Sequence, residues 1–240
     1  MKILSIGNSF SQDATRYLHN LSASGGVSVK TVNLYIGGCS LKTHYYNILE
    51  NAAAYTFEFN GESTGLKVTV KDALMSDDWD IVTLQQVSTQ SPRFETYQPY
   101  LTELAAYVRR YVPHAELYMH QTWAYEDGSE RLRALGFEKS TQMLDGIRAS
   151  YAKAASDIHA AGIIPDGEAM MRALENGMEK VHRDTFHASL GAGRFLLALT
   201  WYGFFTGKPV AENPFSAFDV PVTPEEIALV KKSVGEVLGQ

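Results

Sequence analysis

The sequence predicts one α/β domain built on a parallel β-sheet, and three observations support this class. Strand-like apolar runs alternate with helical patterns from one end of the chain to the other. The segments between the strands are long enough to be the right-handed crossover helices that parallel strands require. No repeat, low-complexity tract or Pro/Gly-rich linker divides the 240 residues, a length that single α/β domains commonly reach. We therefore expect a three-layer α/β/α sandwich that spans residues 1–240.

Five apolar runs are expected to form the strands of the sheet, and seven helical patterns separate or follow them. The strands are predicted at residues 2–6, 27–36, 81–84, 115–120 and 162–165. The helices are predicted at residues 12–23, 41–53, 97–111, 137–161, 168–176, 190–206 and 224–238.

Residues 54–70 interrupt this alternation. Two runs of alternating apolar and polar residues lie on either side of Asn60-Gly61, a dipeptide that favours hairpin turns. We expect a small β-hairpin there, inserted after the second helix as an addition to the five parallel strands.

Composition limits the partners of the chain. The net charge is −6 and no basic tract is present, which argues against a nucleic-acid surface. A single cysteine, Cys39, excludes an internal disulfide. One lysine and a five-residue strand precede Gly7, which leaves no room for a secretory signal, and no apolar run approaches the roughly 18 residues of a membrane span. We expect a cytoplasmic protein, or a secreted one if a signal was trimmed from the sequence, without membrane partner, metal or cofactor; the oligomeric state is left open.

A serine follows the first strand, at the sheet edge where open α/β sheets form their sites. The junction reads Gly7-Asn8-Ser9-Phe10-Ser11, and a helix expected to begin near Gln12 would direct its N-terminal N–H groups towards Ser9. Ser11 could replace Ser9, but its position fits an N-cap better. Ser9 is therefore the predicted nucleophile.

The far end of the chain supplies the partners that a serine nucleophile needs. Asp184 and His187 are three residues apart, so a turn places their side chains on one side. His187 could take the proton of Ser9 while Asp184 fixes the imidazole tautomer, which predicts a Ser-His-Asp triad. A loose metal cluster of these two residues with His182 is the less favoured alternative, because the spacing matches no standard zinc motif.

Two further strand ends carry candidate oxyanion donors. Gly37-Gly38 follows the second strand, and the Gly38 N–H either serves a ligand or belongs to a tight turn. The next residue, Cys39, is a minor alternative nucleophile. Gln85-Gln86 ends the third strand, where a side-chain amide either stabilises an oxyanion or holds the loop together.

The fourth strand ends in His120-Gln121-Thr122-Trp123-Ala124-Tyr125. We interpret His120, Gln121, Trp123 and Tyr125 as candidate substrate contacts, with Trp123 and Tyr125 stacking on a sugar ring or packing an acyl chain. A buried loop anchor is the alternative interpretation of the aromatic pair.

Together these motifs resemble the SGNH (GDSL-like) hydrolases. Ile6-Gly7-Asn8-Ser9 is similar to their first block, Gly38 matches the glycine of the second, and Asp184-x-x-His187 matches the last. The resemblance implies a flavodoxin-like sheet of order 2-1-3-4-5 and ester hydrolysis through an acyl-enzyme. The third block usually reads Gly-x-Asn-Asp, so Gln86 would take the donor role, with Gln85 as the alternative.

The predicted function is therefore a serine esterase that removes a small acyl group, most simply acetyl, from a small-molecule or carbohydrate ester. A glutamine in the third block also occurs in related carbohydrate acetylesterases, which favours a glycan substrate. In this interpretation the N–H groups of Ser9 and Gly38 and the Gln86 amide hold the oxyanion. The alternative is a glycan-binding domain that has kept the cleft without turnover.

Overall fold

Apolar strands form a seven-stranded mixed sheet at the centre of the protein. The computed structural model describes residues 1–240, and its sheet has the order β4-β3-β2-β1-β5-β6-β7. Five strands are parallel, namely β1 (Lys2–Gly7), β2 (Lys30–Tyr35), β5 (Ile81–Leu84), β6 (Glu116–His120) and β7 (Gly162–Ile164). Two are antiparallel, β3 (Tyr55–Phe59) and β4 (Glu62–Val68). The carboxyl ends of the five parallel strands therefore meet at one edge.

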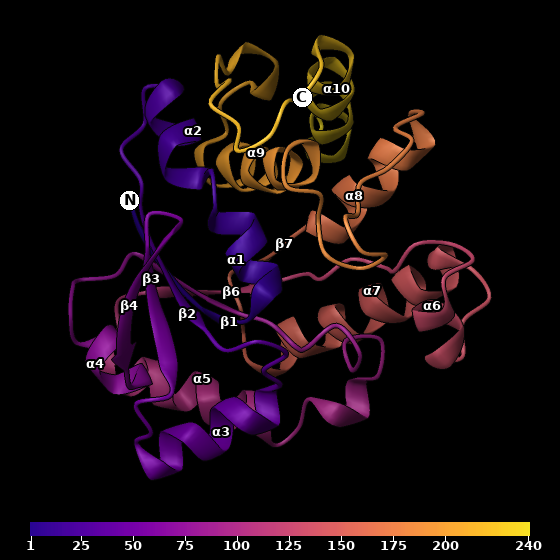
Figure 1. Ribbon diagram of the computed structural model, residues 1–240. Coiled ribbons are helices and arrows are strands. Elements are labelled where there is room, and N and C mark those ends of the chain that lie inside the picture. Colours follow the sequence, from indigo (N-terminus) through magenta and orange to yellow (C-terminus); the bar gives the residue numbers. More distant parts are fainter.

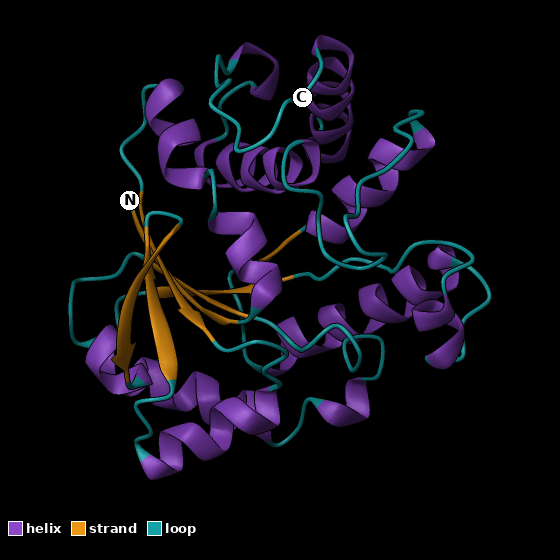
Figure 2. Ribbon diagram, viewed as in Figure 1, coloured by secondary structure: helices purple, strands orange, loops and turns teal.

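Helices cover both faces of the sheet, as expected for an α/β/α arrangement. Figure 1 shows α1, α2, α9 and α10 above the strands and α3, α4, α5 and α7 below them. In Figure 2 the orange strands fan out between these two purple layers. The helices are α1 (Ser9–Thr15), α2 (Leu18–Ser24), α3 (Leu41–Glu50), α4 (Val70–Leu74), α5 (Tyr100–Tyr111), α6 (Glu130–Ala134), α7 (Ser140–Asp157), α8 (Asp166–Glu175), α9 (Ala192–Thr206) and α10 (Pro224–Leu238), with short 3₁₀ turns at Phe94–Thr96 and Val210–Glu212.

The predicted five-stranded sheet is wrong in strand number, because the hairpin joins the sheet. The hairpin forms where Asn60-Gly61 predicts it, with both turn residues at positive φ (50° and 83°). It does not stand apart from the sheet, because β3 pairs antiparallel with β2 and extends that edge by two strands. Gly61 is required at this turn, since a Cβ there would lie 2.2 Å from the carbonyl oxygen of Arg16.

The first helix is also different from the expected one. A single helix over residues 12–23 is replaced by α1 and α2, which are separated at Arg16 and Tyr17. Tyr17 is buried and its hydroxyl donates to the carbonyl oxygen of Leu190 at 2.6 Å. Two further helices, α4 and α6, were not predicted because five residues are too few to show a helical period.

The core is one cluster of 57 buried apolar residues that includes both faces of the parallel strands. β1 lies in its middle, and Ile3, Leu4 and Ile6 are at most 1% exposed because helices cover the strand from both sides. On one face α9 is buried nearly all round, which is the pattern of a core helix. No helix is both long enough and apolar enough to cross a membrane.

Candidate active site

Ser9 is the first residue of α1 and is separated from the end of β1 by Asn8 alone. The helix begins three residues before the expected Gln12, because Asn8 caps it: Asn8 Oδ1 accepts a hydrogen bond from the Phe10 N–H at 3.0 Å. Ser11 completes the cap by accepting from the Asn8 N–H at 3.0 Å, and its own hydroxyl is fully buried. The expectation of Ser11 as N-cap is therefore wrong. As the first helical residue, Ser9 has no intrahelical acceptor for its own N–H.

The chain brings Ser9, His187 and Asp184 into hydrogen-bonding contact. Ser9 Oγ lies 2.8 Å from His187 Nε2, although 178 positions separate the two residues. Asp184 Oδ2 lies 2.7 Å from His187 Nδ1, and Asp184 Oδ1 accepts from the His187 backbone N–H at 2.9 Å. With Nδ1–H donated to the carboxylate, the Nε2 lone pair faces the serine hydroxyl. This is the tautomer that a general base requires.

The carboxylate of Asp184 is held in its charged form. Partial burial acts to raise its pKa, but the hydrogen bonds from the ring and backbone of His187 outweigh this, so the pKa is lowered. His187 is 18% exposed and Asp184 is 45% exposed, so water reaches the pair.

A short closed loop, residues 181–189, presents Asp184 and His187. Its two sides are joined by hydrogen bonds from Arg183 N to the carbonyl oxygen of His187 (3.0 Å) and from Ser189 N to that of Val181 (2.7 Å). Thr185 at its tip has φ 73°, a region that β-branched residues rarely adopt. Such a conformation persists only where the surroundings impose it, so the loop needs external support.

The segment after β6 gives that support. Trp123 Nε1 donates to the carbonyl oxygen of Phe186 at 2.7 Å, and Glu126 N donates to that of Thr185 at 2.8 Å. The indole also stacks on Phe10 of α1, with ring centroids 3.9 Å apart. Trp123 therefore fixes the loop of His187 against the helix of Ser9.

This packing contradicts the prediction that four residues at the end of β6 and just after it contact the substrate. His120, Gln121, Trp123 and Tyr125 are all at most 5% exposed. Gln121 bonds to Glu168, and the Tyr125 hydroxyl lies 2.8 Å from Ser88 Oγ. For Trp123 and Tyr125 the burial agrees with the alternative interpretation as loop anchors, and none of the four side chains presents a surface to a sugar ring.

A buried ion pair makes a second connection between the two halves of the site. Asp13 of α1 is fully buried and binds Arg183, which precedes Asp184, at 2.9 Å. Arg194 of α9 binds the other carboxylate oxygen of Asp13 at 2.8 Å. Sequence reasoning missed this link, because residues 13 and 183 carry no local signal of their pairing.

Both glutamines of the third block are committed to other partners. Gln86 is buried; its Oε1 accepts from Leu41 N at 3.0 Å, and its Nε2 lies 3.1 Å from the carbonyl oxygen of Thr96 and 3.2 Å from Thr96 Oγ1. Gln85 Nε2 donates to Asn8 Oδ1 at 2.8 Å. We therefore revise the expectation that Gln86, or Gln85 in its place, donates to an oxyanion.

Gly38 lies in an exposed turn that Asn8 connects to the start of α1. It is exposed, has φ 63°, and lies in a turn closed by the bond from Cys39 N to the carbonyl oxygen of Ile36 at 3.2 Å. Asn8 Nδ2 donates to the carbonyl oxygen of Cys39 at 3.0 Å, which holds this turn next to the start of α1.

The two alternative chemistries at this edge find little support in the geometry. Cys39 is 2% exposed, and burial raises the pKa of its thiol to about 12, which disfavours the thiolate. His182 Nε2 lies 3.0 Å from the carbonyl oxygen of Ala124, and no group of three or more His, Cys, Asp or Glu side chains is arranged to hold a metal.

His182 leads to a prediction about acid stability. Burial lowers its folded-state pKa to about 4, below the roughly 6.5 of an unfolded histidine, so between these values only the unfolded chain takes up the proton. The contribution of His182 to the stability of the folded protein is therefore complete above about pH 6.5 and is lost as the pH falls towards 4. Between pH 7 and 4.5 we expect this histidine to remove about 2 kcal/mol of unfolding free energy. Urea denaturation of wild type and His182→Gln measures the difference, and an equal loss in both would contradict it.

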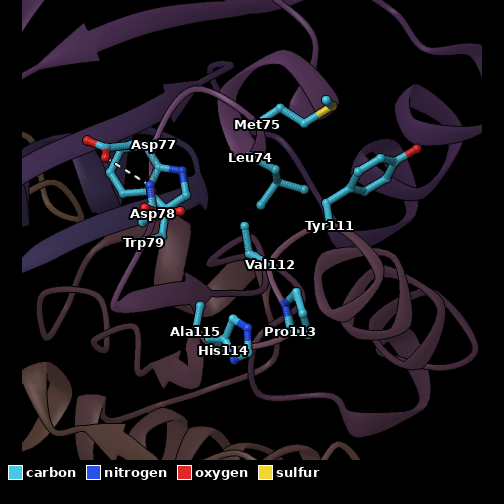
Figure 3. Close-up of a pocket in the computed structure, with 10 residues that line it drawn as sticks. All are labelled: Leu74, Met75, Asp77, Asp78, Trp79, Tyr111, Val112, Pro113, His114 and Ala115. Atoms are coloured by element: carbon cyan, nitrogen blue, oxygen red, sulfur yellow. Dashed lines mark hydrogen bonds between the residues drawn. The ribbon is translucent and has the colours of Figure 1, made fainter.

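A pocket of about 350 Å³ lies at the opposite edge of the sheet (Figure 3). It is lined by residues 74, 75 and 77–79, which precede β5, and by residues 111–115, which precede β6. Leu74 and Val112 lie in its middle, and the carboxylate of Asp77 is bound by Lys2 and Lys30. Because Ser9 follows its strand and these segments precede theirs, the pocket is separate from the candidate active site.

Comparison with solved structures assigns the fold to a known class. A candidate SGNH hydrolase from Slackia heliotrinireducens superposes with a TM-score of 0.61 at 22% identity, over 85% of this chain and 98% of that one. An acetylxylan esterase from Geobacillus stearothermophilus gives 0.51 at 14% identity, over 90% and 94%. The chain thus has the α/β/α fold of these hydrolases.

A family model and a solved structure show the family to which the chain belongs. The model of a domain of unknown function, DUF4886, matches residues 2–233. A DUF4886 protein from Bacteroides uniformis is 34% identical and superposes with a TM-score of 0.91, over 99% of this chain and 94% of that one. The chain belongs to the DUF4886 family. No functionally curated protein matches its sequence.

Proposed function

We propose that this protein is a serine esterase that cleaves small acyl esters. The observation that carries the proposal is the continuous hydrogen-bonded series from Ser9 Oγ through the His187 ring to Asp184, with distances of 2.8 and 2.7 Å. The fold shared with hydrolases agrees with this chemistry.

In the proposed reaction Ser9 Oγ attacks the acyl carbon as its proton moves to His187 Nε2. The carbonyl electron pair becomes the oxyanion of a tetrahedral intermediate. Collapse breaks the bond to the alcohol oxygen, which takes the proton from Nε2 and leaves. His187 then removes a proton from water, the hydroxide attacks the acyl-enzyme, and Ser9 recovers its proton as the acid departs. Asp184 stabilises the imidazolium in both halves of the reaction.

Backbone N–H groups are the proposed oxyanion donors. The Ser9 N–H is free at the start of α1, and the Gly38 N–H belongs to the central peptide of the turn at residues 36–39. Positive φ at Gly38, the third residue of this turn, is what a type II turn requires, and a type II turn reverses the direction of this peptide relative to a type I turn. In this proposal the side chains of Gln85 and Gln86 take no direct part.

Gly38→Ala tests the donor in the turn. Alanine at φ 63° is strained by about 1 kcal/mol, and relaxation to a type I turn would rotate the N–H away. We expect kcat for an acetyl ester to fall by about 10²- to 10³-fold with little change in KM. Gly128→Ala is the matched control, since Gly128 also has positive φ and an unobstructed Cβ position. Equal kcat values in both variants would argue against an oxyanion role for Gly38.

The proposed substrate is an acetyl ester of a carbohydrate. The shared fold with an acetylxylan esterase supports this class. Gly37 and Gly38 are exposed in the turn that Asn8 holds next to the start of α1, which is compatible with a bulky alcohol that stays largely outside the protein.

Covalent labelling tests the proposed function directly. A fluorophosphonate probe should modify wild-type protein at one residue, Ser9, located by mass spectrometry of peptides. Acetylated oligosaccharides should then release acetate on incubation with the protein. Labelling at Cys39, or no labelling with no acetate release, would overturn the proposal.

A further inference from the structure

A series of buried polar side chains connects α8 with the cap of the helix that carries Ser9. Its members, Asp166, His120, Gln85 and Asn8, come from four different segments and are each at most 1% exposed. Asp166 Oδ2 lies 2.8 Å from His120 Nε2, His120 Nδ1 lies 2.9 Å from Gln85 Oε1, and Gln85 Nε2 lies 2.8 Å from Asn8 Oδ1. None of these groups is a partner in the reaction steps above.

The direction of the hydrogen bonds is fixed at the Asn8 end by the backbone. Asn8 Oδ1 faces the N–H of Phe10, which can only donate, and Asn8 Nδ2 faces the carbonyl oxygen of Cys39, which can only accept. The second atom that meets Asn8 Oδ1 must therefore be a donor, so Gln85 directs its NH₂ group towards Asn8 and its oxygen towards His120.

The direction of these hydrogen bonds also determines where the protons of His120 and Asp166 lie. Because Gln85 Oε1 is an acceptor, His120 Nδ1 must carry a hydrogen. Its Nε2 lies beside Asp166 Oδ2 but out of line for an ideal hydrogen bond, and Oδ2 also accepts from Trp201 Nε1 at 2.7 Å. At 2.8 Å, His120 Nε2 and Asp166 Oδ2 cannot face each other with two lone pairs, so one proton lies between them, carried by the ring or by the carboxyl group. Burial raises the pKa of Asp166, and both forms have zero net charge, as this dry site favours.

Gly7 provides the space for this series. A Cβ on Gly7 would lie 2.8 Å from Gln85 Oε1 and 2.2 Å from Ser11 Oγ, so only glycine lets Gln85 pass beside β1 to Asn8. The glycine of the first block thus has a packing reason in addition to its place at the end of the strand.

We propose that Asp166 and His120 are positioning residues for Ser9, acting through Gln85 and Asn8; the proposal rests on the proposed esterase function. Asn8 contacts both backbone segments that carry the proposed oxyanion donors, the start of α1 and the turn of Gly38. If its amide rotated, it would lose the cap of α1 and the bond to Cys39 together. The buried pair prevents that rotation by keeping a donor, His120 Nδ1–H, directed at Gln85.

Asp166→Asn is the sharpest test because it keeps the shape and removes one proton-binding charge. His120 then has a single ring hydrogen for two acceptors, the Gln85 oxygen and the amide oxygen of residue 166. We expect kcat for an acetyl ester, and the rate of fluorophosphonate labelling, to fall about 10- to 100-fold with KM nearly unchanged. Gln85→Glu places a carboxylate oxygen against Asn8 Oδ1 and should have a similar effect; Gln85→Met replaces it if the buried charge prevents folding.

Thr83→Val is the matched control. Thr83 lies two residues before Gln85 on the same face of β5 and donates to Ser5 Oγ of β1 at 3.0 Å, so the variant also removes a buried hydrogen bond between these segments. It should lower Tm but change kcat by less than about twofold. Equal kcat in Asp166→Asn and Thr83→Val would overturn the proposal.

Nuclear magnetic resonance of ¹⁵N-histidine-labelled protein gives a readout independent of turnover. The His120 signals are assigned by their absence from His120→Phe, and Nδ1 should carry a hydrogen at neutral pH. An unprotonated Nδ1 in an active wild-type protein would overturn the positioning role alone. Wild-type protein that is neither labelled nor active would overturn the proposed function, and this role with it.

Discussion

Ser9→Ala is expected to lower kcat for acetyl esters by about 10⁴- to 10⁶-fold and to abolish fluorophosphonate labelling. The variant removes the only oxygen within hydrogen-bonding distance of His187 Nε2, so no nucleophile remains to form the acyl-enzyme. Stability should change by less than about 1 kcal/mol, since Ser9 is partly exposed and Asn8, not Ser9, caps the helix. Steady-state kinetics with thermal denaturation checks both parts.

Ser11→Ala is the matched control within the same five-residue motif. Ser11 is fully buried and bonds to Asn8 and to Asn33 Oδ1 (2.7 Å), so its loss should cost about 1 to 3 kcal/mol of stability. Labelling at Ser9 should persist. If Ser9→Ala kept its activity while Ser11→Ala lost it, the nucleophile would be misassigned.

Local sequence was sufficient to single out the three residues that the structure brings into hydrogen-bonding contact, Ser9, His187 and Asp184. Ser9 stands at a strand–helix junction and Asp184 and His187 are three positions apart, so each half of the site carries its own short-range pattern. The five parallel strands were predictable for the same reason, because each one is a short apolar run between helical patterns. No local pattern indicated that the hairpin pairs with β2, because this pairing depends on contacts between distant segments.

The errors concern residues whose role is set by distant partners. Trp123 has the composition of a sugar-stacking residue, but its indole N–H binds a carbonyl 63 positions away and its ring is buried against Phe10. Gln86 has the chemistry of an oxyanion donor, but Leu41 and Thr96 occupy its amide. In both cases the chemical type of the side chain suited the predicted role, but the side chain is buried and bound to other partners.

These errors have a common physical origin at the carboxyl edge of the sheet. The proposed reaction requires that the start of α1, at Ser9, and the loop of His187 be held within tenths of an ångström of each other. Buried polar side chains such as Trp123 and Asp13 supply this connection, because an unsatisfied buried polar group is costly and therefore allows few alternative arrangements. Under the proposed function, the polar residues at these strand ends thus divide into those that react and those that fix the position of the reacting ones.

Asp184→Asn is expected to lower kcat by about 10⁴-fold, because both oxygens of Asp184 face donors. Oδ1 accepts from the His187 backbone N–H, which cannot change, and Oδ2 accepts from the Nδ1–H. Asparagine has one oxygen, which the backbone N–H will take, so its NH₂ group faces Nδ1 and the ring hydrogen moves to Nε2. An Nε2–H cannot accept the proton of Ser9, and the general base is lost.

Asp219→Asn is the control for this variant. Asp219 is also a partly exposed aspartate with a lowered pKa, caused by hydrogen bonding to Arg16, so the substitution removes a comparable charge away from the triad. It should cost at most about 1 kcal/mol of stability and leave kcat unchanged. Kinetics of the two variants at neutral pH distinguishes tautomer control from a general charge effect. Activity of Asp184→Asn within tenfold of wild type would mean that His187 keeps its working tautomer without the carboxylate, and that Asp184 serves only to shape the loop.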